Sequence, residues 1–271
     1  KTYRKYPWVA SVKVTDCDKD TSKNRAVRVV EMALHVVRVL SRAEPTRELR
    51  HACSKSDALR NAHLYADASN VIHASVSMRA FGPVGINNWH EALMRGSYEL
   101  KVLGSVLRSI VDPIDSHLLH HRLIDAITWF GDAATDSNTS SSIVKYVSAI
   151  ERLFFGKFEA GRTRAFAIRV KSVFEAFNYN GYQFVYDQAL AVYKTRSALV
   201  HGEHLPIEDK ANEIACLAAE LSRMSILCSA QIFPMMSHAF ESPDTAKLEE
   251  VMKRISLEGL DWLAKASGFS T

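Results

Sequence analysis

The chain has 271 residues, enough for one large or two ordinary domains with a substantial hydrophobic core. Hydrophobic residues make up 47% and charged residues 24%, as in ordinary soluble globular proteins, and no apolar run approaches the roughly 20 residues of a membrane-spanning helix. Four scattered cysteines without a C-x-x-C pair argue against a zinc knuckle or a disulfide framework, so we expect a cytoplasmic protein. No secretory signal pattern opens the chain, and a start at Lys1 indicates a processed form or a piece of something longer.

The first part of the chain mixes strand and helix patterns. Residues 8–15 and residues 72–80 alternate between apolar and polar side chains, which predicts two strands. Between them, residues 24–42 carry apolar side chains at helical spacing (Val27, Val30, Leu34 and Val37). The sequence therefore predicts a small α/β (α+β) region over residues 1–112.

Strand patterns occur only before a predicted helix that ends at Asp112 and Pro113. Asn88 and Glu91 resemble a capping box that opens this helix, and Asp112 with Pro113 ends it. We place a domain boundary there, because beyond it nothing has the pattern of a strand. Apolar stripes over residues 113–271 predict a bundle of five or six amphipathic helices, which makes the fold mainly α. The stripes comprise Leu119, Leu123, Ile127, Phe130 and Ala134; Ile143, Val147, Ile150 and Phe154; Phe166, Val170, Val173 and Phe177; Ile214, Leu217, Leu221, Cys228 and Ile232; and Leu248, Met252, Ile255 and Leu263.

Positive charge is concentrated in the first part of the chain. The net charge is +4, but residues 1–110 hold 18 Lys and Arg against 10 Asp and Glu, whereas residues 111–271 hold 16 against 20. A basic first part favours binding to a nucleic-acid backbone. The alternative is a solvated helix face. The nucleic-acid-binding surface and the solvated helix face would consist of the same four side chains, Arg25, Arg28, Arg38 and Arg42.

Chemistry is specified most clearly between Val192 and Glu203, in the segment VYKTRSALVHGE. A helical apolar pattern here carries Arg196 and His201, and Gly202 then stops the helix. A guanidinium suits a phosphate, and an imidazole transfers protons near neutral pH, so the pair points to a phosphodiester substrate. Five helical residues turn the chain by roughly 500°, so the two side chains of one copy point to different sides. One copy therefore makes half a site at best unless the last turn unwinds, and a dimer could bring two arginines and two histidines into one cleft.

This segment resembles the R-x4-H motif of the HEPN superfamily, and its ending RSALVHG is most similar to the Apea-like HEPN group. Three upstream segments fit the resemblance in order: HRLIDAITWFGDA (121–133), SAIERLFF (148–155) and TRAFAIRV (163–170). The resemblance covers about residues 113–235, under half of the chain. Many nuclease members carry Asn, Asp or His directly after the arginine, where this chain has Ser197.

The resemblance implies a HEPN-like helical bundle that works as a metal-independent endoribonuclease in a homodimer. In that chemistry the ribose 2′-hydroxyl attacks the neighbouring phosphorus, His201 transfers protons and Arg196 stabilises the charge on the phosphoryl oxygens. Glu151 matches an acidic position of the family's second helix and is expected to orient Arg196 or a histidine. Ser197 and His204 are further supporting candidates. RNA is the expected partner, no cofactor is expected, and such proteins are often toxins or antiviral defence effectors.

Other interpretations of the same residues stay open. Arg196 and His201 also fit an arginine that extends out of a bundle and a histidine that caps a helix end. Glu151 also fits an ordinary ion-pair partner, and Ser197 a hydroxyl bonded to its own helix. The alternative functions are a non-catalytic HEPN module that dimerises or binds a nucleotide or RNA, and a helical protein-interaction domain. In each case residues 1–112 are a candidate region for a regulatory partner or trigger.

A histidine group was also weighed as a metal site. His117, His120 and His121 have the spacing of neighbours on one helix face, but no nearby carboxylate or cysteine completes a ligand set. We therefore expect a polar face or an interface there, and no metal. The sequence contains none of the phosphate-loop, serine-hydrolase or zinc-protease signatures.

Overall fold

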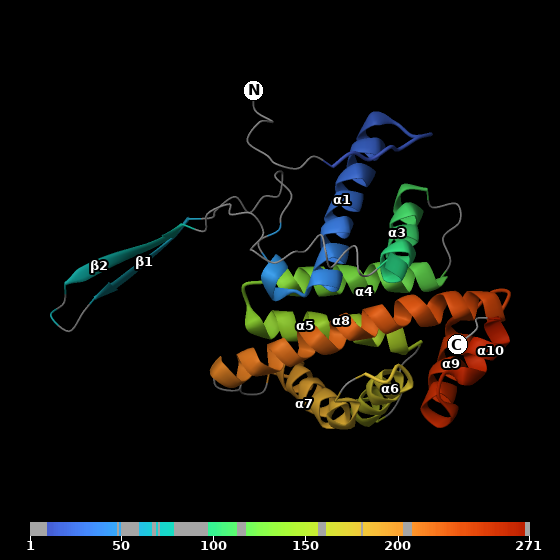
Figure 1. Cartoon of the computed structure of the whole chain (residues 1–271). Helices are drawn as coiled ribbons and strands as arrows, with labels where there is room; N and C mark the ends of the chain where they lie inside the picture. Colours follow the sequence, from blue (N-terminus) through green and yellow to red (C-terminus); the bar gives the residue numbers. More distant parts are fainter. Residues whose placement is uncertain are drawn as a thin grey trace.

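The computed structural model is mainly helical (Figure 1). It describes residues 10–47, 49, 60–66, 69, 71–78, 97–112, 118–156, 161–179, 181–202 and 208–268. The elements are α1 (Lys19–Ser41), η2 (Glu44–Thr46), β1 (Arg60–Ala66), β2 (Ile72–Met78), α3 (Ser97–Val111), α4 (Leu118–Thr135), α5 (Thr139–Phe154), α6 (Arg162–Ala176), α7 (Tyr182–Val200), α8 (Glu208–Ala239), α9 (Thr245–Glu258) and α10 (Asp261–Ser267).

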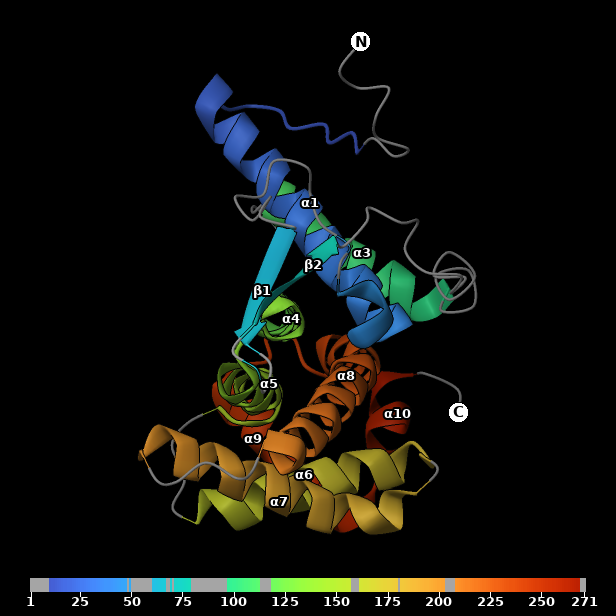
Figure 2. The same cartoon turned by 90° about the vertical axis from the view of Figure 1, so that its left-hand side faces the viewer.

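The helices stack in layers around α5. Helix α5 packs against α4, α6, α7, α8 and α9, and the long helix α8 crosses the bundle beside it. Figures 1 and 2 show α1 and α3 on one side of α4, with α6 and α7 as a pair on the far side of α5 and α8. Helix α5 is therefore the central element of the bundle.

The predicted apolar stripes form the core of this bundle. In α4 and α5 every predicted stripe residue is buried, from Leu119 to Ala134 and from Ile143 to Phe154. In α6, Phe166, Val170 and Val173 are buried and Phe177 packs against the cluster from its edge. The prediction of a mainly α fold is confirmed.

The N-terminal region differs from the prediction of an α+β region. The described part of the first predicted strand, residues 10–15, is not a strand, whereas the second is confirmed as β2. Strand β2 pairs antiparallel with β1, with Leu64 opposite Ala74, and within the described residues these two strands are the whole sheet. Apolar and polar alternation at 10–15 therefore does not suffice, because a strand also needs a neighbour to pair its backbone groups. The described structure does not support an α/β domain.

The predicted boundary at residue 112 does not separate two hydrophobic cores. Met32, Val36 and Val39 of α1 and Leu103 and Val106 of α3 belong to the same buried cluster as the helices that follow. The segment 113–117 and the capping box at Asn88 and Glu91 lie outside the described residues. A separate role for residues 1–112 stays a prediction.

Helix α1 differs from the prediction in where it begins and in which of its faces is buried. It begins at Lys19, earlier than predicted, because the Asp18 carboxylate accepts hydrogen bonds from the backbone N–H groups of Asp20 and Thr21 at 2.9 and 3.0 Å. Its buried apolar residues are Met32, Val36 and Val39, whereas the predicted stripe of Val27, Val30, Leu34 and Val37 is only half-buried. The helix is apolar on more than one side, so periodicity alone did not select the face that is packed.

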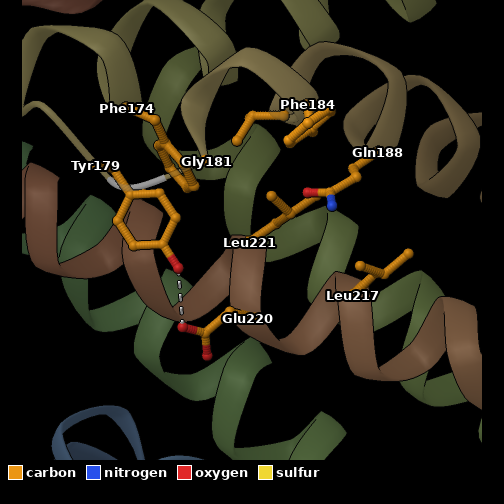
Figure 3. Close-up of a pocket in the computed structure, with 9 residues that line it drawn as sticks. Phe174, Tyr179, Gly181, Phe184, Gln188, Leu217, Glu220 and Leu221 are labelled. Carbon is orange, nitrogen blue, oxygen red and sulfur yellow. Dashed lines mark hydrogen bonds between the residues drawn. The ribbon is translucent and has the colours of Figure 1, made fainter.

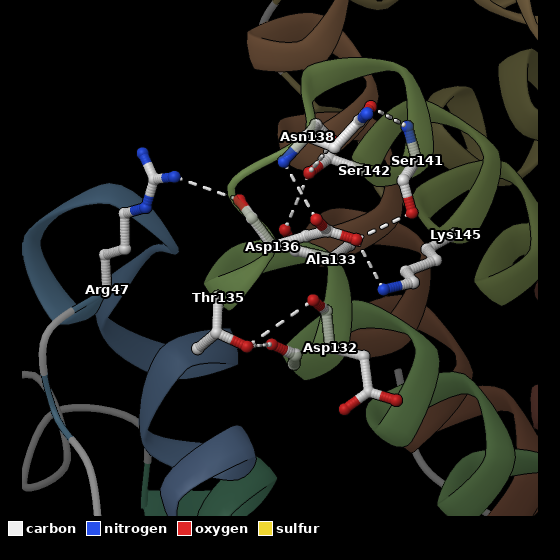
Figure 4. A network of polar contacts seen from close by, with 10 residues as sticks. Arg47, Asp132, Ala133, Thr135, Asp136, Asn138, Ser141, Ser142 and Lys145 are labelled. Carbon is white, nitrogen blue, oxygen red and sulfur yellow. Dashed lines mark hydrogen bonds and ion pairs between the residues drawn. The ribbon is translucent and has the colours of Figure 1, made fainter. Parts of the chain in front are cut away.

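The polar loop between α4 and α5 supplies the cap of α5. The Asn138 side chain accepts from the Ser141 N–H at 3.0 Å, and the Asp136 carboxylate accepts from the Ser141 hydroxyl at 2.6 Å and from Lys145 Nζ at 2.5 Å (Figure 4). Burial opposes ionisation of Asp136, but these hydrogen bonds outweigh it and lower the pKa of Asp136 to about 2. Arg47 donates to the Asp136 carbonyl at 2.9 Å, which ties the segment after α1 to this loop.

Helix α8 contains a long apolar segment. Among the described residues, Asp209–Ala239 is long and apolar enough to span a membrane by length and composition, and 56% of its most apolar window is buried inside the protein. Core helices meet the same criterion. In this fold α8 contributes Leu221, Ile226 and Phe233 to the core.

Gly131 allows close contact between α4 and α1. A Cβ atom at this position would lie 1.1 Å from Nδ1 of His35, so the imidazole occupies the space that any larger residue would need. The ring and the glycine together set the distance between the two helices.

We expect Gly131→Ala to lower the free energy of unfolding by about 1–3 kcal/mol, because the added methyl group displaces the His35 ring. Gly104→Ala in α3 is the control: a Cβ there meets nothing within 4 Å, so it should be neutral or stabilise by up to about 1 kcal/mol. Urea unfolding followed by circular dichroism measures both. Equal effects of the two substitutions would contradict the close contact, and Gly131→Ala should cost less in a His35→Ala background.

Stability should also depend on His35 through pH. Burial, with a smaller contribution from Arg38, lowers the pKa of His35 to about 4 from the ordinary 6.5. The folded state favours the neutral ring, so its contribution is fully present above pH 6.5 and is lost as pH falls from 6.5 through 4, a difference of roughly 3 kcal/mol. Urea unfolding at pH 7.5 and pH 4 should show this loss in the wild type and a smaller one in His35→Gln. The same loss in both proteins would contradict it.

Candidate functional site

The C-terminal end of α5 is held by two arginines from neighbouring helices. Arg122 of α4 donates from Nη1 to the carbonyls of Arg152 and Phe155 at 2.6 and 2.9 Å, and Arg169 of α6 donates to the Phe154 carbonyl at 2.5 Å. Both side chains are buried, with 2% and 8% exposure. The last carbonyls of a helix lack partners within it and carry partial negative charge, which explains why cations bind here.

Glu249 of α9 completes this clamp. Its carboxylate accepts from Arg169 Nη2 and from the Gly156 backbone N–H, both at 2.6 Å. Burying a guanidinium is unfavourable unless charge and hydrogen bonds compensate it, and Glu249 supplies both. Side chains from α4, α6 and α9 therefore hold the C-terminal end of α5 in place.

Glu151 lies in that last turn and faces α6 and α7. Its Oε1 accepts from Arg162 Nε at 2.8 Å and from the Tyr193 hydroxyl at 3.1 Å, and its Oε2 accepts from Arg196 Nη2 at 3.4 Å. The side chains of Glu151, Arg162 and Arg196 are 14%, 23% and 24% exposed, so solvent reaches each of them. We refer to Glu151, Arg162, Tyr193 and Arg196 as the Glu151 cluster.

Two guanidinium groups contact the same carboxylate in the Glu151 cluster. Tyr193 stays neutral, because burial first, and the adjacent carboxylate second, raise the pKa of its hydroxyl. Helix α6 begins at Arg162 with no side-chain cap from the described residues, and a helix N-terminus adds partial positive charge. The Glu151 carboxylate is therefore contacted by positive groups from both α6 and α7.

Arg196 is held less tightly than Arg162. Its contact with Glu151 is at the long limit of a hydrogen bond, and its guanidinium lies 5.7 Å from the Tyr193 ring centroid. Its Nε is buried and has no hydrogen-bond partner among the described residues. Arg196 is thus the member of the cluster whose hydrogen bonds are least complete.

His201 caps the end of the same helix. Its backbone N–H donates to the Ser197 carbonyl at 3.0 Å, its side chain is exposed, and Gly202 follows with φ of 74°, a conformation that favours glycine. The stop at Gly202 is confirmed. The described residues show no contact between His201 and Arg196, in agreement with the five-residue separation.

The structure describes two of the three supporting residues that the sequence predicted. Ser197 lies half-buried on α7, and Glu151 contacts Arg196, as the orienting role requires. His204 lies outside the described residues. Sequence reasoning missed Arg162, although it comes directly before TRAFAIRV, because nothing in the linear sequence shows that this helix start lies beside Glu151.

The four predicted nucleic-acid-binding arginines do not form one basic face. Arg38 is buried at 3% exposure and its guanidinium donates to the Leu49 carbonyl, so its assignment as a nucleic-acid contact is wrong. The apolar neighbours Val36 and Val39 draw that side of α1 into the core. Arg25 donates to the Val111 carbonyl at 3.3 Å, whereas Arg28 and Arg42 are exposed.

The structure also places the histidines that were weighed as metal ligands. His120 and His121 lie on α4, and His117 lies outside the described residues. Within the described part of the chain, no three potential metal ligands gather at one point.

A separate apolar pocket of about 220 Å³ lies between α8 and the turn from α6 to α7 (Figure 3). Phe174, Leu217 and Leu221 line it, and the Tyr179 hydroxyl donates to Glu220 at 3.4 Å at its edge. Glu220 is already bound by Arg223 at 2.8 and 3.0 Å. The pocket contains none of the residues of the Glu151 cluster.

Comparison with known proteins adds no family to this geometry: no family model matches the chain, and no curated protein and no solved structure matches it either.

We expect Glu151→Ala to lower the free energy of unfolding by about 1–3 kcal/mol, because it removes the carboxylate that two partly buried guanidinium groups and the Tyr193 hydroxyl contact. Glu175→Ala is the matched control: it removes a carboxylate that pairs with Lys171 on the surface of α6, at 47% exposure, and should cost less than about 0.5 kcal/mol. Chemical denaturation of the three proteins makes the comparison. A Glu151 variant as stable as the Glu175 variant would show that the cluster is not a structural unit.

Proposed function

We propose that the chain is a HEPN-type protein that cleaves RNA without a metal ion, with Arg196 and His201 as catalytic residues. The observation that carries the proposal is that Glu151 contacts a partly exposed Arg196, while His201 is exposed at the end of the same helix. The resemblance assigns roles to these three residues together. Their positions are compatible with those roles.

The proposed reaction needs only groups that these residues and the RNA supply. The ribose 2′-oxygen forms a bond to the neighbouring phosphorus and the bond to the 5′-oxygen breaks. An imidazole at position 201 accepts the 2′-hydroxyl proton, and an imidazolium donates one to the leaving oxygen. Arg196 donates hydrogen bonds to the phosphoryl oxygens, which carry the most charge in the transition state. The products are a 2′,3′-cyclic phosphate and a 5′-hydroxyl.

A homodimer is part of this proposal, because one subunit does not bring the two groups together. Arg196 points toward Glu151 of α5, whereas His201 follows the end of α7 and is exposed. Val200, next to His201, is 52% exposed, and a second copy would cover this apolar helix end. Two copies of α7 would then supply two arginines and two imidazoles to one site. A cytoplasmic location and a role as a toxin or antiviral effector are further parts of the proposal and rest on the resemblance alone.

A second candidate is a non-catalytic module that binds a nucleotide or RNA through Arg196. The observation in its favour is that Arg196 is already ion-paired with Glu151 and lies against Tyr193, as a structural arginine would. Such a module would bind a nucleotide saturably, lose affinity in Arg196→Ala and leave RNA intact.

We expect the purified protein to cleave single-stranded RNA in EDTA and to leave 2′,3′-cyclic phosphate ends. Arg196→Ala and His201→Ala should each lower the rate by about 10²-fold or more, because each removes a group that acts in the transition state. Gel analysis of end-labelled RNA, with end-group identification by mass spectrometry, measures both.

The control variant is His238→Ala, which removes another exposed imidazole at the end of α8 and should leave the rate unchanged. Melting temperatures show whether each variant is folded. Cleavage that survives both Arg196→Ala and His201→Ala would contradict the proposed function.

A further inference from the structure

The pocket between α8 and the turn from α6 to α7 has buried apolar walls and an exposed aromatic ring at its edge (Figure 3). Phe174, Val185 and Leu221 line it and are buried. Phe184 lines it too but is 61% exposed, so this ring borders both the pocket and the solvent. An aromatic ring in that position offers a face on which another planar ring can stack. The walls therefore suit a ligand with flat, apolar faces.

Polar side chains line the same pocket. Gln188 of α7 carries an amide that has no hydrogen-bond partner among the residues that the structure describes. Glu220 of α8 accepts two hydrogen bonds from Arg223 and one from the Tyr179 hydroxyl, whereas a carboxylate offers about four acceptor sites. Burial opposes ionisation of Glu220, but the hydrogen bonds and charge of Arg223 outweigh it and lower the pKa of Glu220. The pocket thus offers an ionised acceptor and a free amide.

These two groups define the polar edge of a suitable ligand. A carboxylate repels phosphate and carboxylate groups and accepts hydrogen bonds only from N–H or O–H donors. A glutamine amide forms a pair of hydrogen bonds with a neighbouring donor and acceptor, as it does with N6 and N7 of adenine. Nucleobases combine such edges with two faces that stack on aromatic side chains. Adenine, guanine and cytosine also carry an exocyclic amino group that can donate to a carboxylate, and uracil carries none.

We propose that this pocket binds a nucleobase that carries an exocyclic amino group, with adenine as the best match to Gln188. Phe184 stacks on one face of the base, Gln188 pairs with its edge, and Glu220 accepts a hydrogen bond from the amino group. The base belongs either to a free nucleoside or to an unpaired position of an RNA strand. The pocket shares no residue with the Glu151 cluster, so base binding does not depend on the proposed RNA cleavage.

Ligand-observed NMR titrations of the purified protein with adenosine and with uridine test this site. We expect adenosine to bind saturably and uridine to bind about tenfold more weakly, because uracil has no amino group for Glu220. Phe184→Ala should weaken adenosine binding about tenfold, since it removes the stacking face. Gln188→Ala should also weaken it about tenfold and reduce the preference for adenosine over uridine, since it removes the pair of hydrogen bonds to the edge.

Two matched controls separate the pocket from the protein surface in general. Gln183→Ala removes an exposed glutamine near the start of α7 that does not line the pocket. Tyr98→Ala removes an aromatic ring that is 41% exposed on α3. Both variants should bind adenosine as the wild type does, and melting temperatures show whether every variant is folded. Equal losses in the control variants and in the pocket variants would overturn the inference.

A fluorescein-labelled oligo(A) strand with methylated 2′-hydroxyls distinguishes the two sources of the base. Anisotropy that shows tighter binding of this strand than of adenosine, with the same losses in Phe184→Ala and Gln188→Ala, would support a base in RNA. Equal affinities for the strand and adenosine would support a free nucleoside. If neither probe loses affinity in the two pocket variants, the inference is overturned and the nuclease proposal stands. Adenosine binding that depends on Phe184 and Gln188, with RNA left intact by the wild type, would support the inference and contradict the nuclease proposal.

Discussion

The capped end of α5 is the interaction on which the rest of the structure depends. Arg122 and Arg169 bring two buried guanidinium groups to carbonyls that the helix itself leaves without partners. Because these arginines come from α4 and α6, and Glu249 from α9 balances the charge, one helix end joins four helices. Glu151 lies in the same turn, so the clamp that stabilises the bundle also fixes the carboxylate of the candidate site.

Two arginines share one carboxylate in the candidate site. Arg162 Nε donates to Glu151 Oε1 at 2.8 Å, whereas Arg196 Nη2 donates to Glu151 Oε2 at 3.4 Å. The longer of these two contacts is the weaker one. In the proposed function, a phosphate that binds Arg196 would replace a long ion pair in a partly exposed setting, where such pairs stabilise little. The Arg196 side chain is 24% exposed, so solvent already reaches it. Ser197, one residue beyond, differs from the common pattern of the family that the segment resembles.

The sequence predicted the bundle well and the N-terminal region poorly, for physical reasons that particular residues show. Ile143, Val147, Ile150 and Phe154 repeat at helical spacing and are all buried, because α5 packs against α4, α6, α7, α8 and α9. Residues 10–15 alternate as a strand does, yet whether a strand forms depends on a partner that no local pattern reveals. Arg38 was expected at the surface from its charge, and only the packing of Val36 and Val39 buries it. Within the site, the motif indicated Arg196, His201 and Glu151, whereas Arg162 enters through the tertiary contact between α5 and α6.

The most direct test of this account is a crystal structure of the protein with a single-stranded RNA whose 2′-hydroxyls are methylated, so that it cannot be cleaved. The account predicts a phosphate within about 3 Å of the guanidinium group of Arg196, with an imidazole at position 201 from one of two subunits beside the 2′-oxygen. RNA bound elsewhere, with Arg196 still closed on Glu151 in a single subunit, would contradict it.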